Sequence, residues 1–397
     1  MPQSFFEFLA IADQERIHSQ MLAWMLSPSQ ENAPLDAEQR RRLLLDVFNF
    51  EVTALACETL RVKTELKQID IVVLADGNML VIENKLKSRQ SQGQLARYTA
   101  TIEAFVGNPA NGVNGVVRKC FLTFSGEQAR QDGWQDVDYR RLHSALDEVN
   151  PNSQYVRDYA SMLGRLLDNR DDFLGSHTQH SLVFARSGMS NEVRLAGPSQ
   201  PHESGVERFT FDNRLERIFY EALLMQVGQR LDPGVHLVNE TRGQALIDTR
   251  LFTFGTAAGI VFNCGLQLQG RSVKLTVGAA DLSQSDRAQI LALEAPLDAA
   301  IAGALGDGPV ARNRRPAPRR AFRSWSYTLA DVDLLERNSI TDFVAAQNCR
   351  IEWARDTWAC VLDQLGNVGT VQNVEAHVMR QPVELIGRLQ AVALAEI

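Results

Sequence analysis

The sequence predicts an α/β domain followed by an α+β domain. Its length of 397 residues exceeds what one ordinary hydrophobic core organises, so two domains are expected. Near the middle, a stretch rich in Ser, Gly and Pro lacks hydrophobic periodicity and is typical of a linker. We therefore expect domains over residues 1–185 and 209–397, joined by a linker over residues 186–208.

In the first domain, segments with helical spacing surround a β-like region. Asp13 is placed to cap the second expected helix, and Pro28 ends it. The β-like region covers residues 61–86 and holds a hairpin of alternating Ile, Val and Leu residues. The remaining pattern predicts helices at about 4–11, 13–27, 36–47, 90–105, 142–149 and 154–168, and a strand at 116–124.

The second domain reads as a set of strands mixed with longer helices. A Pro- and Arg-rich loop covers residues 306–323. Strands that follow one another closely indicate an antiparallel sheet. The expected strands are 235–241, 245–254, 259–268 and 272–278, and the expected helices are 212–228, 283–305, 339–365 and 382–396.

Composition excludes several classes of protein. Hydrophobic residues make up 45% and charged residues 22%, which are ordinary globular values. No apolar run approaches the ~18–20 residues of a membrane span, and the N-terminus does not read as a signal peptide. The five cysteines form no CxxC pair, which favours neither disulfides nor a zinc site. We expect a soluble cytoplasmic protein whose affinity for nucleic acid, at a net charge of −7, comes from local patches.

The hairpin in residues 69–86 predicts two carboxylates placed opposite one another. The sequence Ala-Asp-Gly-Asn at 75–78 is a strong signal for a two-residue type I′ turn. If Ala75 pairs with Asn78, then Asp70 faces Glu83 across the strands, with Cβ atoms ~5 Å apart. Two facing acids repel, and a bound cation turns that repulsion into coordination.

A lysine completes the constellation. Lys85 lies two residues after Glu83 and projects from the same strand face. Oxygen ligands from Asp70, Glu83 and the Asn84 carbonyl suit Mg²⁺ or Mn²⁺. Lys85 would orient or activate the attacking water and offset negative charge in the transition state. These residue types predict a metal-dependent phosphodiesterase.

The segment IDIVVL…MLVIENKL resembles the core signature of the PD-(D/E)XK nuclease superfamily. Asp70 corresponds to the first acid, and Glu83-Asn84-Lys85 corresponds to the (D/E)XK element, with Ile69 where the label has proline. The resemblance spans roughly residues 10–130. It implies a restriction-endonuclease-like core, in which helices flank a mixed central sheet, and Mg²⁺-dependent hydrolysis of DNA, with a role in defence against foreign DNA.

Two helices extend this resemblance. Gln94 and Tyr98, four residues apart on one helical face, resemble the QxxxY helix of one branch of the superfamily. Glu15 and His18 resemble the N-terminal helix of a bacterial subgroup, in which a glutamate joins the metal site. Glu65 is a further candidate acid on the strand before Asp70. The resemblance thus implies catalytic roles for Gln94 and Tyr98 and a metal ligand in Glu15.

Nucleic acid would contact basic and aromatic side chains near this site. Arg97 and Tyr98 lie on the predicted QxxxY helix, and arginines of the 306–323 loop could bind phosphates without reading sequence. The loop arginines in question are Arg314, Arg315, Arg319 and Arg320.

Each of these assignments has an alternative. The hairpin could be a surface turn with a salt bridge to Lys85, the two helices could be ordinary amphipathic ones, and the arginine loop could simply be solvated. Glu65 is better explained as a surface residue. Function likewise has alternatives: an RNA-cleaving nuclease, a nuclease gated by a signal, or a catalytically silent nucleic-acid-binding protein of the same fold. The sequence leaves homo-oligomer formation open.

Overall fold

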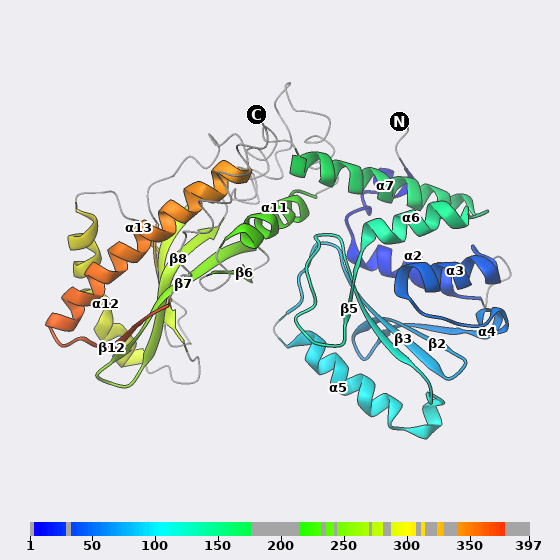
Figure 1. The fold of residues 1–397 in the computed structure, drawn as a ribbon, viewed down its shortest axis with the longest axis horizontal. Helices are drawn as coiled ribbons and strands as arrows, with labels where there is room; N and C mark the ends of the chain where they lie inside the picture. Colours follow the sequence, from blue (N-terminus) through cyan, green and yellow to red (C-terminus); the bar gives the residue numbers. More distant parts are fainter. Residues whose placement is uncertain are drawn as a thin grey trace, which may run out of the picture. The chain divides into compact units, whose positions relative to one another are not determined.

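The computed structural model describes residues 4–28, 33–91, 93–175, 215–231, 236–241, 244–269, 272–280, 287–306, 311–313, 324–328 and 340–377. These residues divide into two compact units (Figure 1). The first contains the described residues up to 175 together with 215–222, and the second contains the described residues from 223 onward. The predicted linker at 186–208 and the predicted helix at 382–396 lie outside the described residues, so the domain boundaries stay a prediction.

A mixed five-stranded sheet forms the centre of the first unit, with strand order β1-β2-β3-β4-β5. Strand β2 is antiparallel to both of its neighbours, β1 and β3, whereas β3, β4 and β5 run parallel. This arrangement confirms the predicted α/β fold with a mixed central sheet. The strands are β1 (Arg61–Leu66), β2 (Ile69–Ala75), β3 (Asn78–Lys85), β4 (Val117–Thr123) and β5 (Gln135–Asp138).

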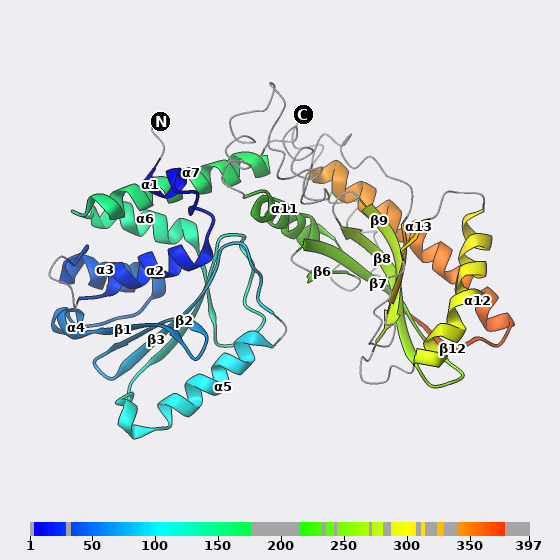
Figure 2. The same ribbon diagram turned by 180° about the vertical axis from the view of Figure 1, so that it is seen from behind.

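Helices cover both faces of this sheet. Helix α5 lies on one face, whereas α2, α3, α6 and α7 lie on the other (Figures 1 and 2). The bounds are α1 (Phe5–Phe8), α2 (Glu15–Leu26), α3 (Ala37–Phe48), α4 (Ala54–Thr59), α5 (Gln94–Val106), the 3-10 helix η1 (Pro109–Asn111), α6 (Tyr139–Val149) and α7 (Gln154–Gly175). The short elements α4 and β5 were not predicted, because four to six residues carry too little periodicity.

A side-chain cap marks the start of α3 but not the start of α2. Asp36 caps α3 in a reciprocal capping box with Gln39. The prediction that Asp13 caps α2 is wrong. Gln14 is the N-cap residue, and within the described part of the chain no side chain caps that helix. Asp13 instead forms an ion pair with Lys87, in the segment that follows β3.

Strands β2 and β3 are buried on both faces, as expected for strands that lie between helices. Val72 and Val81 pack with Leu95 and Ile102 of α5. On the opposite face, Ile71 and its neighbours are equally inaccessible to solvent. The hairpin is therefore an interior element, and any polar group at its end must find partners inside the protein.

The second unit contains an antiparallel sheet with strand order β10-β11-β9-β8-β7-β12, and β6 pairs with β7. This confirms the expected antiparallel sheet with helices. The strands are β6 (His236–Thr241), β7 (Gln244–Thr256), β8 (Val261–Gln269), β9 (Ser272–Ala279), β10 (Ala311–Asn313), β11 (Ser324–Thr328) and β12 (Val371–Ala376). The helices are α12 (Arg287–Leu305) and α13 (Ile340–Asn367), and α11 (Glu216–Arg230) begins in the first unit. Across the described residues, no helix has the length and apolar character that a membrane crossing requires.

Candidate active site

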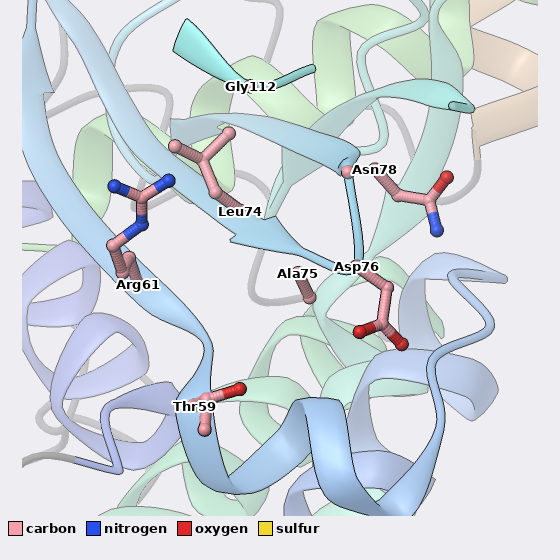
Figure 3. A pocket seen from close by; sticks show the side chains of 8 residues that line it. Thr59, Arg61, Leu74, Ala75, Asp76, Asn78 and Gly112 are labelled. Atoms are coloured by element: carbon pink, nitrogen blue, oxygen red, sulfur yellow. The ribbon is translucent and has the colours of Figure 1, made fainter. Parts of the chain in front are cut away.

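The hairpin of β2 and β3 has the predicted register. Ala75 pairs with Asn78, and the pairing continues to Ile71 and Ile82. Asp76 and Gly77 have φ values of 50° and 74°, as a type I′ turn requires. A small pocket beside this turn is lined by Asp76 and its neighbours (Figure 3). It lies six residues along β2 from Asp70, about 20 Å at the rise of an extended strand, and is therefore not part of the acidic site.

The paired residues end at Ile71 and Ile82, and one further step along both strands reaches Asp70 and Glu83. The two carboxyl groups interact with each other electrostatically. Asp70 Oδ2 accepts a hydrogen bond from the Asn84 N–H at 2.8 Å, which fixes the carboxylate at the end of the hairpin. The Glu83 side chain is only 1% exposed. Burial raises the pKa of Glu83 to about 8, with Lys85 opposing the shift and Asp70 adding to it. Burial also raises the pKa of Asp70.

The two oxygens of Glu83 have different surroundings. Oε1 lies 2.7 Å from Lys85 Nζ and accepts a hydrogen bond from Gln94 Nε2 at 2.8 Å. Oε2 is buried and receives no hydrogen bond from an N–H or hydroxyl group of the described residues, and the Glu83 carboxyl group lies within reach of the Asp70 carboxyl. A buried carboxylate oxygen without a partner is costly. This oxygen has the chemistry of a ligand position for a cation.

Lys85 lies between acids. Its side chain is 10% exposed, and Nζ is 3.8 Å from Glu15 Oε1 in addition to its contact with Glu83. Burial works against the charged ammonium, but the carboxylates of Glu83 and Glu15 outweigh it and raise the pKa of Lys85. The lysine is therefore a fixed positive charge at the hairpin end.

Helix α5 brings Gln94 and Tyr98 to the same place. Gln94 Nε2 donates to Tyr98 Oη at 3.1 Å as well as to Glu83. Tyr98 Oη in turn donates to the Gln68 carbonyl at 2.8 Å, in the turn before β2. A chain of hydrogen bonds thus connects the helix, the turn and the buried acid. The sequence did not indicate Gln68, because a backbone acceptor carries no residue signature.

Glu15, at the start of α2, holds the segment that follows β3. Its carboxylate accepts hydrogen bonds from the Leu86 N–H at 2.9 Å, the Ser88 N–H at 3.3 Å and Ser88 Oγ at 2.8 Å. Glu15 is therefore next to the site, close to Lys85, with both oxygens engaged. Its predicted role as a metal ligand stays a prediction.

Asn84 directs its side chain to the sheet face opposite α5. Its Nδ2 donates to Ser19 Oγ at 2.9 Å, and its Oδ1 accepts from Tyr139 Oη at 2.6 Å. These contacts fasten the end of β3 to α2 and α6. Because the Asn84 side chain is engaged in this way, the predicted metal ligand at this position is the backbone carbonyl of Asn84. Ser19 and Tyr139 are supports that no motif in the sequence indicated.

The remaining candidates lie in other surroundings. Both ring nitrogens of buried His18 are engaged, Nδ1 with Tyr159 Oη and Nε2 with the Ala12 carbonyl. Burial lowers the pKa of His18 to about 4. Glu65 is exposed and pairs with Arg16 at 3.7 Å.

The predicted nucleic-acid contacts divide into two groups. Arg97 is exposed on α5, one turn from Gln94. The four loop arginines lie outside the described residues, and their role stays a prediction. They are Arg314, Arg315, Arg319 and Arg320.

The residues at the hairpin end fit a divalent cation. Among the described residues, no group of three or more His, Cys, Asp or Glu side chains has the arrangement of a complete metal cluster. Asp70 and Glu83 nevertheless offer hard carboxylate oxygens at adjacent positions, one of them buried without a partner. Mg²⁺ is commonly held by one or two carboxylates, with waters and substrate phosphate completing its shell.

A family model of known proteins matches the first part of the chain. Residues 3–185 match the family model described as the PD-(D/E)XK nuclease superfamily. No curated protein and no solved structure matches the chain. The matched range is less than half of the chain and contains the mixed sheet, the hairpin and α5. Over residues 3–185, the chain is therefore similar to the PD-(D/E)XK nuclease superfamily, as its hairpin motif predicts.

Proposed function

We propose that the first unit is a nuclease that hydrolyses DNA phosphodiester bonds with Mg²⁺ or Mn²⁺. The observation that carries this proposal is the buried Oε2 of Glu83, which has no hydrogen-bond partner among the described residues and lies beside Asp70. A structural hairpin gains nothing from two adjacent carboxylates whose pKa values are both raised by burial. A metal-binding hairpin requires them.

Asp70 and Glu83 would hold the cation, with the Asn84 carbonyl as a third donor. When bound, a divalent cation supplies Lewis-acid polarisation of the phosphoryl group and positive charge for the transition state. The Asn84 N–H keeps Asp70 Oδ2 in place. This hydrogen bond reduces the freedom of the first carboxylate before any ligand arrives.

Lys85 supplies a second positive charge next to the acids. Its pKa is raised, so the ammonium is retained at neutral pH. From this position the ammonium would orient the attacking water and stabilise the charge that develops on the phosphate. Burial strengthens both effects because little water screens the lysine.

Gln94 would act by holding Glu83, and the buried Tyr98 would act by holding Gln94 through its hydroxyl. The Gln94 amide fixes Glu83 Oε1, which leaves Oε2 for the cation. Arg97, exposed on the same helix, and the loop arginines would bind phosphates of the backbone. Defence against foreign DNA is the biological setting that the family resemblance implies.

The experiment incubates the full chain with plasmid, linear duplex and single-stranded DNA and with RNA, each with Mg²⁺, Mn²⁺ or a chelator. DNA cleavage that requires the metal and is lost in Glu83→Gln and Lys85→Met supports the proposal. Glu58→Gln, an exposed acid on α4, is the matched control and should cleave like the wild type.

Three outcomes would contradict the proposal. Cleavage of RNA alone would reassign the substrate, since metal-assisted phosphate chemistry does not by itself distinguish the two nucleic acids. Cleavage that persists with chelator, or in purified Glu83→Gln, would remove the site assignment. If the protein binds DNA but cleaves it under none of these conditions, it is a nucleic-acid-binding protein of the same fold without catalytic activity.

A further inference from the structure

The segment between β3 and α5 connects two proposed site residues. Lys85 ends β3 and Gln94 begins α5, and the structure describes residues 86–91 of the chain between them. We refer to residues 86–91 as the connecting segment. Its last residue contacts the site directly, because the Ser91 N–H donates to Gln94 Oε1 at 3.0 Å. The position of this segment therefore affects how the Gln94 amide meets Glu83.

A buried ion pair holds the middle of the connecting segment. Arg89 Nε lies 2.6 Å from Glu221 Oε1, and the two side chains are only 3% and 2% exposed. Arg89 Nη1 is also buried and has no hydrogen-bond partner among the described residues. Two charges removed from water in this way depend on each other, since deleting one leaves the other buried and uncompensated.

A second acid holds the neighbouring residue. Glu127 Oε2 accepts a hydrogen bond from the Gln90 N–H at 3.1 Å, and Gln90 Oε1 accepts from the Arg130 N–H at 3.1 Å. Together with Glu15 at residues 86 and 88, these contacts give the connecting segment partners along most of its length. Glu221 differs from the other two acids because it lies beyond the residues that match the nuclease superfamily.

Apolar packing of helix α11 fixes the position of Glu221 beside Arg89. Phe219 packs edge to face on Phe173 of α7, with ring centroids 5.2 Å apart. Ile218 and Phe219 are completely buried. The first half of α11 is thus part of the core of the first unit, to which residues 215–222 belong. The acid is fixed by apolar packing on the same helix.

We propose that Glu221 is a positioning residue for the nuclease site: through Arg89 it holds the connecting segment and thereby sets Gln94 against Glu83. This inference rests on the function proposed above. It also predicts that residues 3–185 alone lack a support of their own active site. Glu221 is hydrogen-bonded to Arg89 and is not one of the proposed metal ligands, so its effect would pass through Arg89 and residues 90 and 91.

The test compares Glu221→Gln in the full chain with Glu7→Gln. Glu7 also forms a largely buried ion pair in the first unit, with Arg165, but it does not contact the connecting segment. Hydrogen exchange of the amides at residues 86–91 should become about tenfold faster in Glu221→Gln and stay unchanged in Glu7→Gln. The value of kcat for DNA cleavage should fall about tenfold in Glu221→Gln, with KM nearly constant.

A double-mutant cycle separates positioning from general loss of stability. If Glu221 acts through Gln94, then Glu221→Gln should cost little further activity in a Gln94→Ala background. Additive losses would overturn the inference, as would unchanged exchange at residues 86–91. If Glu221→Gln does not fold, the double variant Arg89→Met, Glu221→Met replaces it in the same measurements. Removing both charges leaves neither one buried without its partner.

The exchange measurement also keeps this inference distinct from the proposed function. A wild-type chain that cleaves nothing would contradict the nuclease proposal, while faster exchange in Glu221→Gln alone would still support the hold on the connecting segment. Conversely, an active wild type whose kcat and exchange are unaffected by Glu221→Gln would overturn the inference and leave the nuclease proposal in place.

Discussion

Replacing Glu83 by glutamine should stabilise the metal-free protein at neutral and alkaline pH. Burial raises the pKa of Glu83 from 4.5 to about 8. The folded chain therefore holds a proton that the unfolded chain releases over this range. The contribution of Glu83 to stability is greatest below pH 4.5 and is lost as pH rises towards 8, at about 1.4 kcal/mol per pH unit. Over the whole window the loss is at most about 5 kcal/mol.

The assay is urea unfolding followed by far-UV circular dichroism at pH 5, 6, 7 and 8 in the presence of chelator. Glu83→Gln should show a flatter dependence on pH than the wild type and should be the more stable of the two at pH 8. Glu58→Gln controls for the loss of one negative charge at an exposed position. Added Mg²⁺ should then stabilise the wild type at pH 8 but not Glu83→Gln, because only the wild type keeps both carboxylates. Parallel pH curves for the wild type and Glu83→Gln would refute the reasoning.

The remaining predictions concern neighbouring residues. Lys85→Met should lower kcat for DNA cleavage by about 100-fold or more while the circular dichroism spectrum stays native; a smaller loss would deny the lysine a catalytic role. Tyr98→Phe, which keeps the ring but removes the hydroxyl that joins Gln94 to the Gln68 carbonyl, should lower kcat about tenfold with little change in Tm; unchanged kcat would leave the hydroxyl structural. Asn84→Ala should lower the free energy of unfolding by about 1–3 kcal/mol, because Tyr139 Oη loses its buried acceptor; urea unfolding measures this, and unchanged stability would contradict it. Burial lowers the pKa of His18 from 6.5 to about 4, so protonation of this ring should cost the fold about 3 kcal/mol as pH falls through that range; urea unfolding at pH 4 to 7 measures this, and an equal slope in His18→Gln would contradict it.

Local rules account for what the sequence predicted well. The Asp-Gly turn sets the register of β2 and β3 because both turn residues have positive φ, and strand alternation then determines which residues share a face. Helical periodicity likewise placed Gln94 and Tyr98 on one face of α5. These patterns involve residues within a few positions of each other, so the chain itself specifies them.

Long-range packing decided the rest. Nothing near Asn84 in the sequence indicates that its side chain meets Ser19 and Tyr139 on the opposite side of the sheet, or that His18 is enclosed. The prediction for Asp13 was wrong because an ion pair with Lys87 was available to it in place of the helix cap. Such contacts depend on which elements pack together.

By itself, the sequence determined the hairpin and the placement of its acids and lysine. The tight turn sets the strand register, and side chains that alternate between the two strand faces then have only one possible arrangement. Only the tertiary structure decided that Glu83 is buried with one oxygen unpartnered among the described residues, and that Glu221 reaches Arg89 from 132 residues away. The physical reason is that burial and ion pairing are properties of surroundings. A residue acquires its surroundings only when distant segments pack around it.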